Sequence, residues 1–416
     1  MPTLNETPNS NRLHIGVFGR TNSGKSSLIN AITKQEVSIV ADVAGTTTDL
    51  VYKAMEIHPL GPCVLIDTAG FDDISELGKK RVEKTMLAVE KSDVAVLVIS
   101  LDMVTEKWRT DGIKFSDVFP EEAIWFEKLS NKKIPVLVVV NKVDQDSVKA
   151  QEFVEWTRKQ LGPEIEILGV SCRSRDGIDR ITSSIARILP EDYGTEFITG
   201  KLIKEDDLVL LVMPQDIQAP KGRLILPQVQ TIRELLDRKC MVVSVTTDKL
   251  EKSLSMLTKP PKLIITDSQV FGYVYEHKPK ESMLTSFSVL FAAYKGDLPY
   301  YMEGAKVIDQ LTEQSKVLIA ECCTHAPLTE DIGREKIPRM LRKRIGEALT
   351  IDLVSGTDFP DDPGKYDLII QCGACMFNRK YVLSRIDTAR KHQVPMTNYG
   401  VTIAHLTGIL DKISTT

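Results

Sequence analysis

A multidomain α/β fold is predicted for this chain of 416 residues, for three reasons. The length favours roughly two to four domains, each able to bury its own core. Apolar runs of strand length alternate with amphipathic helices over residues 12–185, which is typical of a doubly wound α/β domain. The alternation resumes after 189–206, a polar segment with Pro and Gly that indicates a linker. We therefore expect domains over 1–188, 189–268 and 269–416.

The strands and helices of the first region are predicted from the clear periodicity of its apolar residues. Its strands are short runs of Val, Ile and Leu, as expected of buried parallel strands. The last helix is stopped by Pro190. We expect strands at 13–18, 64–66, 94–99 and 135–140, with helices from 27 to about 33, over 77–91 and over 178–188.

The second region is a shorter α/β set of roughly 60–70 residues, which is small for an independent core. We therefore expect it to dimerise, although packing on a neighbouring domain of the same chain would serve equally. Its predicted elements are a strand at 207–213, a loop rich in Pro and Gly up to Pro227, helices at 231–237 and 249–257, and strands at 241–245 and 263–266.

The third region repeats the alternation with longer helices. Strands are expected at 316–320, 349–353, 366–371 and 394–397, and helices at 299–313, 336–349, 379–392 and 401–411.

Residues 19–26 carry the pattern G-x-x-x-x-G-K-S between the first strand and the first helix. In this P-loop the backbone N–H groups turn around phosphate and the helix N-terminus favours negative charge. Lys25 reaches the β- and γ-phosphates, and the Ser26 hydroxyl ligates Mg²⁺. The residues predicted to bind nucleotide here are Gly19, Asn22, Ser23, Gly24, Lys25, Ser26 and Ser27.

Two later motifs complete a magnesium and phosphate site. Asp67 to Gly70 reads D-T-A-G at a strand end, where the Asp67 carboxylate holds Mg²⁺ and Gly70 approaches the γ-phosphate. Residues 45–49 include three consecutive threonines in the position of switch I, and we favour Thr47 as the Mg²⁺ ligand. We assign Lys25, Thr47, Asp67 and Gly70 to the hydrolytic site.

The base-binding motifs predict guanine rather than adenine. N-K-x-D occupies 141–144, and the Asp144 carboxylate accepts from two guanine donors that adenine lacks. Ser171-Cys172-Arg173 resembles the last guanine-binding loop of GTPases. GTP is therefore the predicted nucleotide, held at this end by Asn141, Lys142, Asp144, Ser171 and Cys172.

Two positions narrow the type of GTPase. Phe71 follows D-T-A-G, where many GTPases place a Gln that orients the attacking water. Asn22 lies where GTPases of the TrmE and Era type carry an Asn that helps hold K⁺. The resemblance implies that K⁺ replaces an arginine finger and that turnover is slow without a partner. The alternative is that Asn22 only turns the loop.

The composition argues against several functional classes of protein. Charge is balanced, with 53 basic and 57 acidic residues, and aromatic residues make up 6%. Neither favours nucleic-acid binding. The polar residues 1–11 do not resemble a signal peptide, and no apolar run has the length of a membrane span. We expect a cytoplasmic protein, in which the seven cysteines stay reduced.

Two cysteine clusters follow predicted strands of the third region. Cys322-Cys323-Thr324-His325 follows the strand at 316–320, and Cys372-Gly373-Ala374-Cys375 follows the strand ending at Gln371. Open α/β sheets bind their ligands at such strand ends. Three thiolates in this arrangement suit an iron–sulfur cluster or zinc. C-x-x-C alone would also fit a thioredoxin-like redox pair.

Across the whole chain the motifs resemble the FeFe-hydrogenase maturation GTPases, the HydF family. That family combines a TrmE/Era-like GTPase domain, a small middle domain and a C-terminal domain with C-x-H, a spacer and H-C-x-x-C. Here Cys323-Thr324-His325 and Cys372 to Cys375 match, but Gln371 replaces the second His. The resemblance implies a 4Fe-4S cluster on Cys323, Cys372 and Cys375, with His325, Glu330 or exchangeable solvent as fourth ligand. Cys322 is an alternative to Cys323.

The resemblance also implies a function. The family accepts a 2Fe precursor from radical-SAM maturases and delivers it to the apo-FeFe-hydrogenase, as a homodimer or larger assembly. Two other hypotheses share the GTPase region: a tRNA-modifying or ribosome-assembly GTPase with a structural zinc, and a redox-sensing GTPase. Six Lys/Arg within 334–344 form either a docking face, for an acidic partner or for the anionic diiron precursor, or a solvated helix face.

Overall fold

A computed structural model describes residues 7–33, 50–71, 76–214, 224–322 and 331–415, with only the backbone of 76–82. The chain divides into two compact units, Met1–Tyr193 and Gly194–Thr416. No helix in the described ranges combines the length and apolar character that crossing a bilayer requires.

The first unit is built on one sheet with the strand order β2-β3-β1-β4-β5-β6. Neighbouring strands run parallel, except that β2 pairs antiparallel with β3. The strands are β1 (Leu13–Gly19), β2 (Val51–Ile57), β3 (Gly61–Asp67), β4 (Val94–Ser100), β5 (Val136–Asn141) and β6 (Glu166–Gly169).

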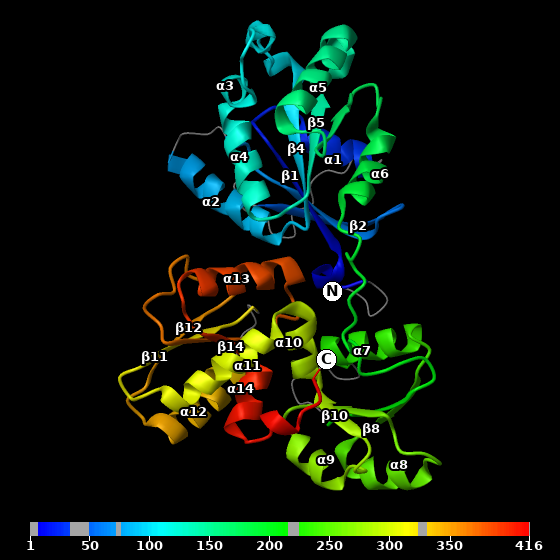
Figure 1. The fold of residues 1–416 in the computed structure, drawn as a ribbon, viewed down its shortest axis with the longest axis vertical. Helices are drawn as coiled ribbons and strands as arrows, with labels where there is room; N and C mark the ends of the chain where they lie inside the picture. Colours follow the sequence, from blue (N-terminus) through cyan, green and yellow to red (C-terminus); the bar gives the residue numbers. More distant parts are fainter. Residues whose placement is uncertain (1–6, 34–49, 72–75, 215–223, 323–330, 416) are drawn as a thin grey trace. The chain divides into compact units, whose positions relative to one another are not determined.

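Helices cover both faces of this sheet, as the sequence predicts (Figure 1). One face packs on α1 (Lys25–Thr33) and α6 (Ile178–Ile188). The other packs on α2 (Glu76–Lys91), α4 (Pro120–Asn131) and α5 (Ser147–Leu161), with the short α3 (Phe115–Val118) beside them. Because β1, β4 and β5 lie between two helical layers, their side chains are buried on both faces, which explains their unbroken apolar sequences.

The second unit contains two further parallel sheets. The first has the order β10-β9-β7-β8. Its strand β10 lies beyond residue 268, so this sheet extends past the expected boundary between 268 and 269. The elements are β7 (Leu208–Val212), β8 (Met241–Val245), β9 (Leu263–Thr266), β10 (Met283–Ser286), α7 (Leu226–Asp237), α8 (Leu250–Met256), α9 (Phe271–His277) and α10 (Phe287–Lys295).

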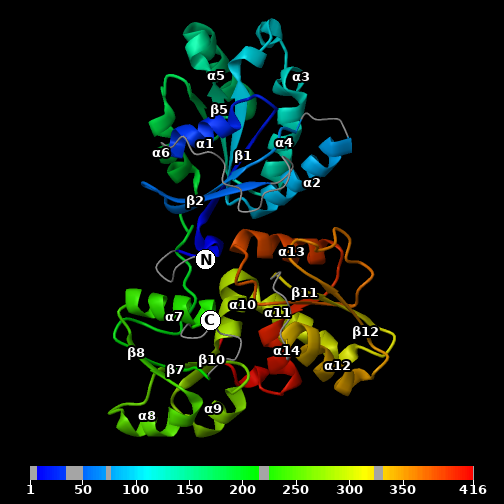
Figure 2. The ribbon, with the colours of Figure 1, turned by 180° about the vertical axis from the view of Figure 1, so that it is seen from behind.

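The second sheet of this unit has the order β12-β11-β13-β14. Figure 2 shows α13 on one face and α12 on the other. Its elements are β11 (Lys316–Ala320), β12 (Thr350–Val354), β13 (Leu368–Gln371), β14 (Met396–Asn398), α11 (Leu298–Lys306), α12 (Ile337–Ile345), α13 (Arg379–Lys391) and α14 (Tyr399–Leu406).

Several helix bounds differ from those predicted. α7 begins at Leu226, five residues early, because Pro227 occupies its first turn, where a missing N–H costs nothing. α11 gives way to a 3₁₀ turn at Val307–Gln310. α12 ends at Ile345 because Gly346 adopts φ 137°, and α14 ends at Leu406.

A continuous apolar core joins the two sheets of the second unit. It combines inward residues of β7, β9 and β11 with α10, α11, α13 and α14. α10 contacts α7 on one side and α13 and α14 on the other. This helix therefore connects the layer beneath the first sheet with the loops that follow β13.

Candidate functional sites

The P-loop lies between the end of β1 and the start of α1, the context that phosphate binding requires. Lys25 is the first residue of α1 and is buried. Its ammonium donates to the carbonyls of Gly19 at 3.0 Å and Arg20 at 2.8 Å. Arg20 in turn forms ion pairs with Glu121 and Glu122 of α4. These contacts hold the P-loop in one conformation around the Lys25 side chain.

Ser26 and Asp67, the residues predicted to bind Mg²⁺, contact each other. The Ser26 hydroxyl donates to Asp67 Oδ2 at 2.6 Å. Burial raises the pKa of Asp67, although Ser26 and Lys25 oppose that shift. The Thr68 hydroxyl donates to Val17 O at 2.7 Å and anchors the D-T-A-G turn that ends at Gly70. Thr47, the predicted third participant, lies outside the described residues.

Asn141 connects the P-loop to the loops predicted to bind guanine. It is 2% exposed, and its amide donates to Ser23 O at 3.1 Å. Its oxygen accepts from the amides of Lys142 at 2.8 Å and Cys172 at 3.3 Å. At Gly24, φ is +94° and a Cβ would lie 2.2 Å from the Asn141 amide nitrogen, so only glycine permits this approach.

The other residues predicted to bind guanine are held by local contacts. The Ser171 hydroxyl donates to Asp144 Oδ1 at 2.6 Å, which orients that carboxylate. The Lys142 ammonium contacts Asn22 O at 3.2 Å and Asp102 Oδ2 at 2.7 Å. Burial raises the pKa of Cys172 to about 11, so its thiol stays neutral. Sequence reasoning missed Asp102, although its place just after β4, at the strand ends that form the site, was a usable signal.

Phe71 belongs to the core. It is 8% exposed and stacks on Trp125 of α4, with ring centroids 5.4 Å apart. The side chain after D-T-A-G therefore points into the apolar layer and orients no water.

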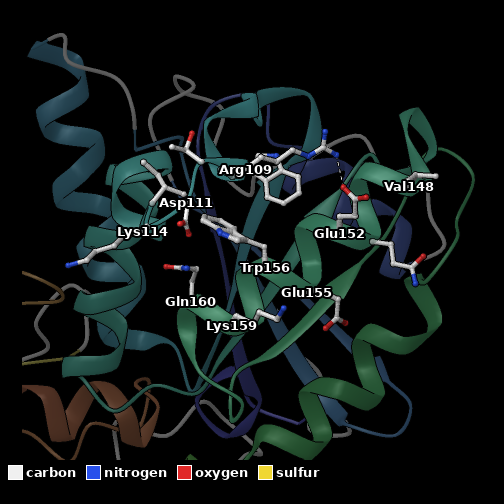
Figure 3. Close-up of a pocket in the computed structure, with 14 residues that line it drawn as sticks. Arg109, Asp111, Lys114, Val148, Glu152, Glu155, Trp156, Lys159 and Gln160 are labelled. Atoms are coloured by element: carbon white, nitrogen blue, oxygen red, sulfur yellow. Dashed lines mark hydrogen bonds and ion pairs between the residues drawn. The ribbon is translucent and has the colours of Figure 1, made fainter.

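A separate groove of about 960 Å³ lies between α5 and the turn at Glu106–Arg109. Figure 3 shows Arg109 and Glu152, an ion pair with N–O distance 2.5 Å, together with Trp156 and Gln160. None of the predicted nucleotide-binding residues lines this groove, so it is distinct from the phosphate and guanine site.

Cys322, the described residue of the first cysteine cluster, contacts Cys372 of the second at one edge of the last sheet. β11 and β13 are adjacent and parallel, with Ala320 opposite Gln371, so Cys322 and Cys372, which come shortly after these strands, lie close together. The amide of Cys322 donates to Cys372 Sγ at 3.0 Å. Hydrogen bonds from the Cys322 thiol and the Ala374 amide lower the pKa of Cys372. The site thus favours thiolate at Cys372.

The predicted ligand set is only partly described. Cys323, His325 and Glu330 lie within 323–330, outside the described residues. Among the residues that are described, no three His, Cys, Asp or Glu side chains are arranged to hold a metal ion. Cys372 and Cys375 are described, and Cys322, the residue directly before Cys323, contacts Cys372.

Two buried cations border these sulfurs. Lys295 of α10 donates to the carbonyls of Ala374, Cys375 and Phe377. Burial lowers the pKa of Lys295 to about 8, while the neighbouring thiols act in the opposite direction. Arg385 of α13 donates to Cys322 Sγ at 3.6 Å. A set of thiols beside buried positive charge fits an anionic, sulfur-ligated metal group.

Gln371, at the position of the family's second His, is buried at the end of β13. Its side-chain oxygen and the Tyr399 hydroxyl are buried without a hydrogen-bond partner among the described residues. The basic stretch at 334–344 is amphipathic: Ile337 and Leu341 are buried, whereas Arg334 and Arg344 pair with Glu321 and Asp309.

Comparison with known proteins first identifies the GTPase region. Residues 14–142 match the family model described as "50S ribosome-binding GTPase". GTPase Der of Campylobacter concisus is 32% identical over 177 residues, covering 42% of this chain and 34% of that protein. The tRNA modification GTPase MnmE of Magnetococcus marinus is 34% identical over 202 residues, covering 47% and 38%. The chain thus spans little more than a third of the length of these relatives.

Among solved structures, Aquifex aeolicus Era bound to GDP·AlF4⁻ aligns with 21% identity and a TM-score of 0.35, covering 56% of this chain and 92% of that one.

The second unit is identified by two further family models. Residues 198–296 match "Hydrogen maturase F dimerization domain" and residues 299–415 match "Hydrogen maturase F tetramerization domain". These domains indicate a homo-oligomer. They follow a first unit with the P-loop, Mg²⁺ and guanine motifs of a GTPase. The chain therefore belongs to the hydrogen maturase F (HydF) family and carries its GTPase domain at the N-terminal end.

Proposed function

We propose that this protein is a GTP-binding scaffold and carrier that assembles and delivers the 2Fe precursor of the FeFe-hydrogenase active site. The observation that carries the proposal is the contact between Cys322 and Cys372 at one sheet edge, beside two buried cations. Family membership supports the role, since both oligomerisation domains match hydrogen maturase models.

A 4Fe-4S cluster is proposed as the resident cofactor. Cys323, Cys372 and Cys375 would hold it, and the fourth position would be taken by His325, Glu330 or exchangeable ligand. Such a cluster supplies an iron that can anchor the diiron cargo. Cys372 contributes a sulfur already oriented by two N–H groups, and Lys295 holds the C-x-x-C loop in place. Gln371 is a poor iron ligand because a neutral amide is a weaker donor to iron than an imidazole or a thiolate.

The GTPase domain would act as a switch. Lys25, Ser26 and Asp67 would contact phosphate and Mg²⁺, and Asp144, which accepts a hydrogen bond from Ser171, would bind guanine; the contacts of Lys25 with Gly19 and of Ser26 with Asp67 support this. We propose slow hydrolysis assisted by K⁺ near Asn22, since Phe71 cannot orient water. Hydrolysis would change the contacts made with radical-SAM maturases and with apo-hydrogenase. Dissociation rates of these partners, measured with GTP plus K⁺ and without nucleotide, test the coupling, and equal rates would refute it.

Metal content tests the proposal directly. Purified without oxygen, the full chain should contain iron and sulfide and should lose both in Cys372→Ser and Cys375→Ser. Cys240→Ser is the matched control, because Cys240 is buried near the start of β8, away from these loops. A colourless protein with bound zinc would instead favour the alternative of a tRNA-modifying or ribosome-assembly GTPase, which the names of the relatives allow.

A further inference from the structure

Two cations are buried around the C-x-x-C loop, and neither has an acidic partner in the part of the chain that the structure describes. Lys295 and Arg385 are each 2% exposed. Neither forms an ion pair with a carboxylate of the described residues: Lys295 contacts three carbonyls, and Arg385 contacts Gly356 O, Cys322 Sγ and three aromatic rings. Removing a charge from water is costly unless an anion compensates it. An anionic group bound at this site would therefore stabilise the two buried cations.

The loop geometry shows where that charge belongs. The Lys295 ammonium donates hydrogen bonds to three carbonyls of the loop, those of Ala374 at 3.1 Å, Cys375 at 3.4 Å and Phe377 at 2.8 Å. Ala374 adopts φ 50°, a left-handed conformation in which successive N–H groups can face one side of a loop. Its amide donates to Cys372 Sγ, which also receives the Cys322 amide. The three loop carbonyls thus face the Lys295 ammonium, while the amides of Ala374 and Cys322 face the Cys372 sulfur.

Lys295 also joins two parts of the unit. It ends α10, within the residues that match the dimerization domain, whereas the loop it holds belongs to the residues that match the tetramerization domain. One side chain therefore ties the C-x-x-C loop to a helix that packs under the other sheet.

We propose that Lys295 is a positioning residue for the thiolate-bound iron–sulfur cluster, which it serves in two ways: it fixes the loop through three carbonyls, and its charge raises the reduction potential of the cluster. This inference rests on the proposed function, since it requires the cluster. A reduced cluster carries one more negative charge than an oxidised one, so a buried cation stabilises the reduced form more. Arg385 adds a second charge on the Cys322 side.

Two variants separate charge from loop fixation. Lys295→Gln keeps N–H donors for the carbonyls but removes the charge, and Lys295→Met removes both. Lys278→Met is the matched control, because Lys278 also donates to three carbonyls, of Pro279, Lys280 and Ser282, but lies in the loop before β10. Each full-length protein is reconstituted with iron and sulfide without oxygen. Iron content and the midpoint potential, from redox titration followed by electron paramagnetic resonance, are then measured.

We expect Lys295→Gln to retain iron close to the wild-type level with a lower midpoint potential. The oxidised-to-reduced ratio at the wild-type midpoint should rise about tenfold, which is about 59 mV for a one-electron couple. Lys295→Met should lose most of its iron, and Lys278→Met should match wild type in both readouts.

A wild-type potential in Lys295→Gln would overturn the electrostatic role, and full iron content with a wild-type potential in Lys295→Met would overturn the whole inference. If Lys295→Met does not fold, the decision rests on Lys295→Gln alone. A wild-type protein that binds no cluster would instead refute the proposed function together with this inference, and that outcome is distinguished by iron analysis before any variant is compared.

Discussion

Replacing Asn141 by Ala should uncouple the P-loop from the guanine-binding loops. In the wild type its side chain donates to Ser23 O and accepts from the amides of Lys142 and Cys172. Alanine removes all three hydrogen bonds and leaves buried backbone groups unpaired. At about 1 kcal/mol for a typical net hydrogen bond, and somewhat more for a buried group left unsatisfied, the loss is about 3 kcal/mol.

Because about 1.4 kcal/mol corresponds to a tenfold change in an equilibrium constant, GTP affinity should fall by roughly 100-fold if the whole loss appears in binding. The alternative is that part of it appears in the free energy of unfolding. Fluorescence titration with a labelled guanine nucleotide measures the first quantity, and urea unfolding without nucleotide measures the second. GDP binding should weaken by the same factor as GTP binding, since none of the three bonds involves the region of the γ-phosphate.

The matched control is Asn131→Ala, because Asn131 is the exposed last residue of α4. We expect it to leave both quantities within about 0.5 kcal/mol of wild type. The reasoning would be refuted if Asn141→Ala changed GTP affinity and unfolding free energy by no more than this control does.

Three further predictions concern hydrolysis. Burial raises the pKa of Asp67, so Mg²⁺-dependent hydrolysis should fall as pH drops through that raised value, at a higher pH than for a free carboxyl. Without Mg²⁺ the free energy of unfolding of the first unit should rise as pH falls through the same range, because the folded state takes up a proton on Asp67 while the unfolded state does not yet do so. A pH-rate profile of the same shape for Asp67→Asn would contradict the assignment of the fall in hydrolysis to Asp67. Phe71→Gln should lower the unfolding free energy by about 3 kcal/mol, as for loss of a buried aromatic, without raising the rate of hydrolysis; a faster enzyme of wild-type stability would show that the position faces the γ-phosphate. Hydrolysis should be faster in KCl than in NaCl of equal ionic strength, and Asn22→Ala should remove the difference; an equal rate in both salts would argue that Asn22 only shapes the loop.

Much of the first unit was predictable because its signals are local. The strand, loop and helix around Lys25 are contiguous, and a buried parallel strand between two helical layers must be apolar throughout. The predicted site residues Ser26, Asp67 and Asn141 are far apart in sequence, but Asp67 and Asn141 end strands and Ser26 follows one shortly after its end, all at one edge of the sheet. Asp102 was not predicted as a site residue because it belongs to no known motif. Its role depends on pairing with Lys142 across that edge, which only the structure shows.

The second unit was harder for a physical reason. β10 is four residues long and runs directly into α10, so the apolar run shows neither strand alternation nor a clear helix start. Lys295 resembles an ordinary cation at a helix C-terminus, and only the fold shows that it is buried against a loop about 80 residues later. The predicted ends of α11 and α14 were too late because periodicity continues into 3₁₀ turns that do not extend the α-helix.

Transfer of iron cargo tests the central claim most directly. The wild-type protein, loaded with the diiron precursor and freed of excess, is mixed with apo-FeFe-hydrogenase, and hydrogen evolution is measured. We predict activation by the loaded wild type and none by Cys372→Ser carried through the same loading. Equal activation by both, or none by a wild type shown to contain its cluster and cargo, would contradict a carrier whose metal site depends on this sulfur.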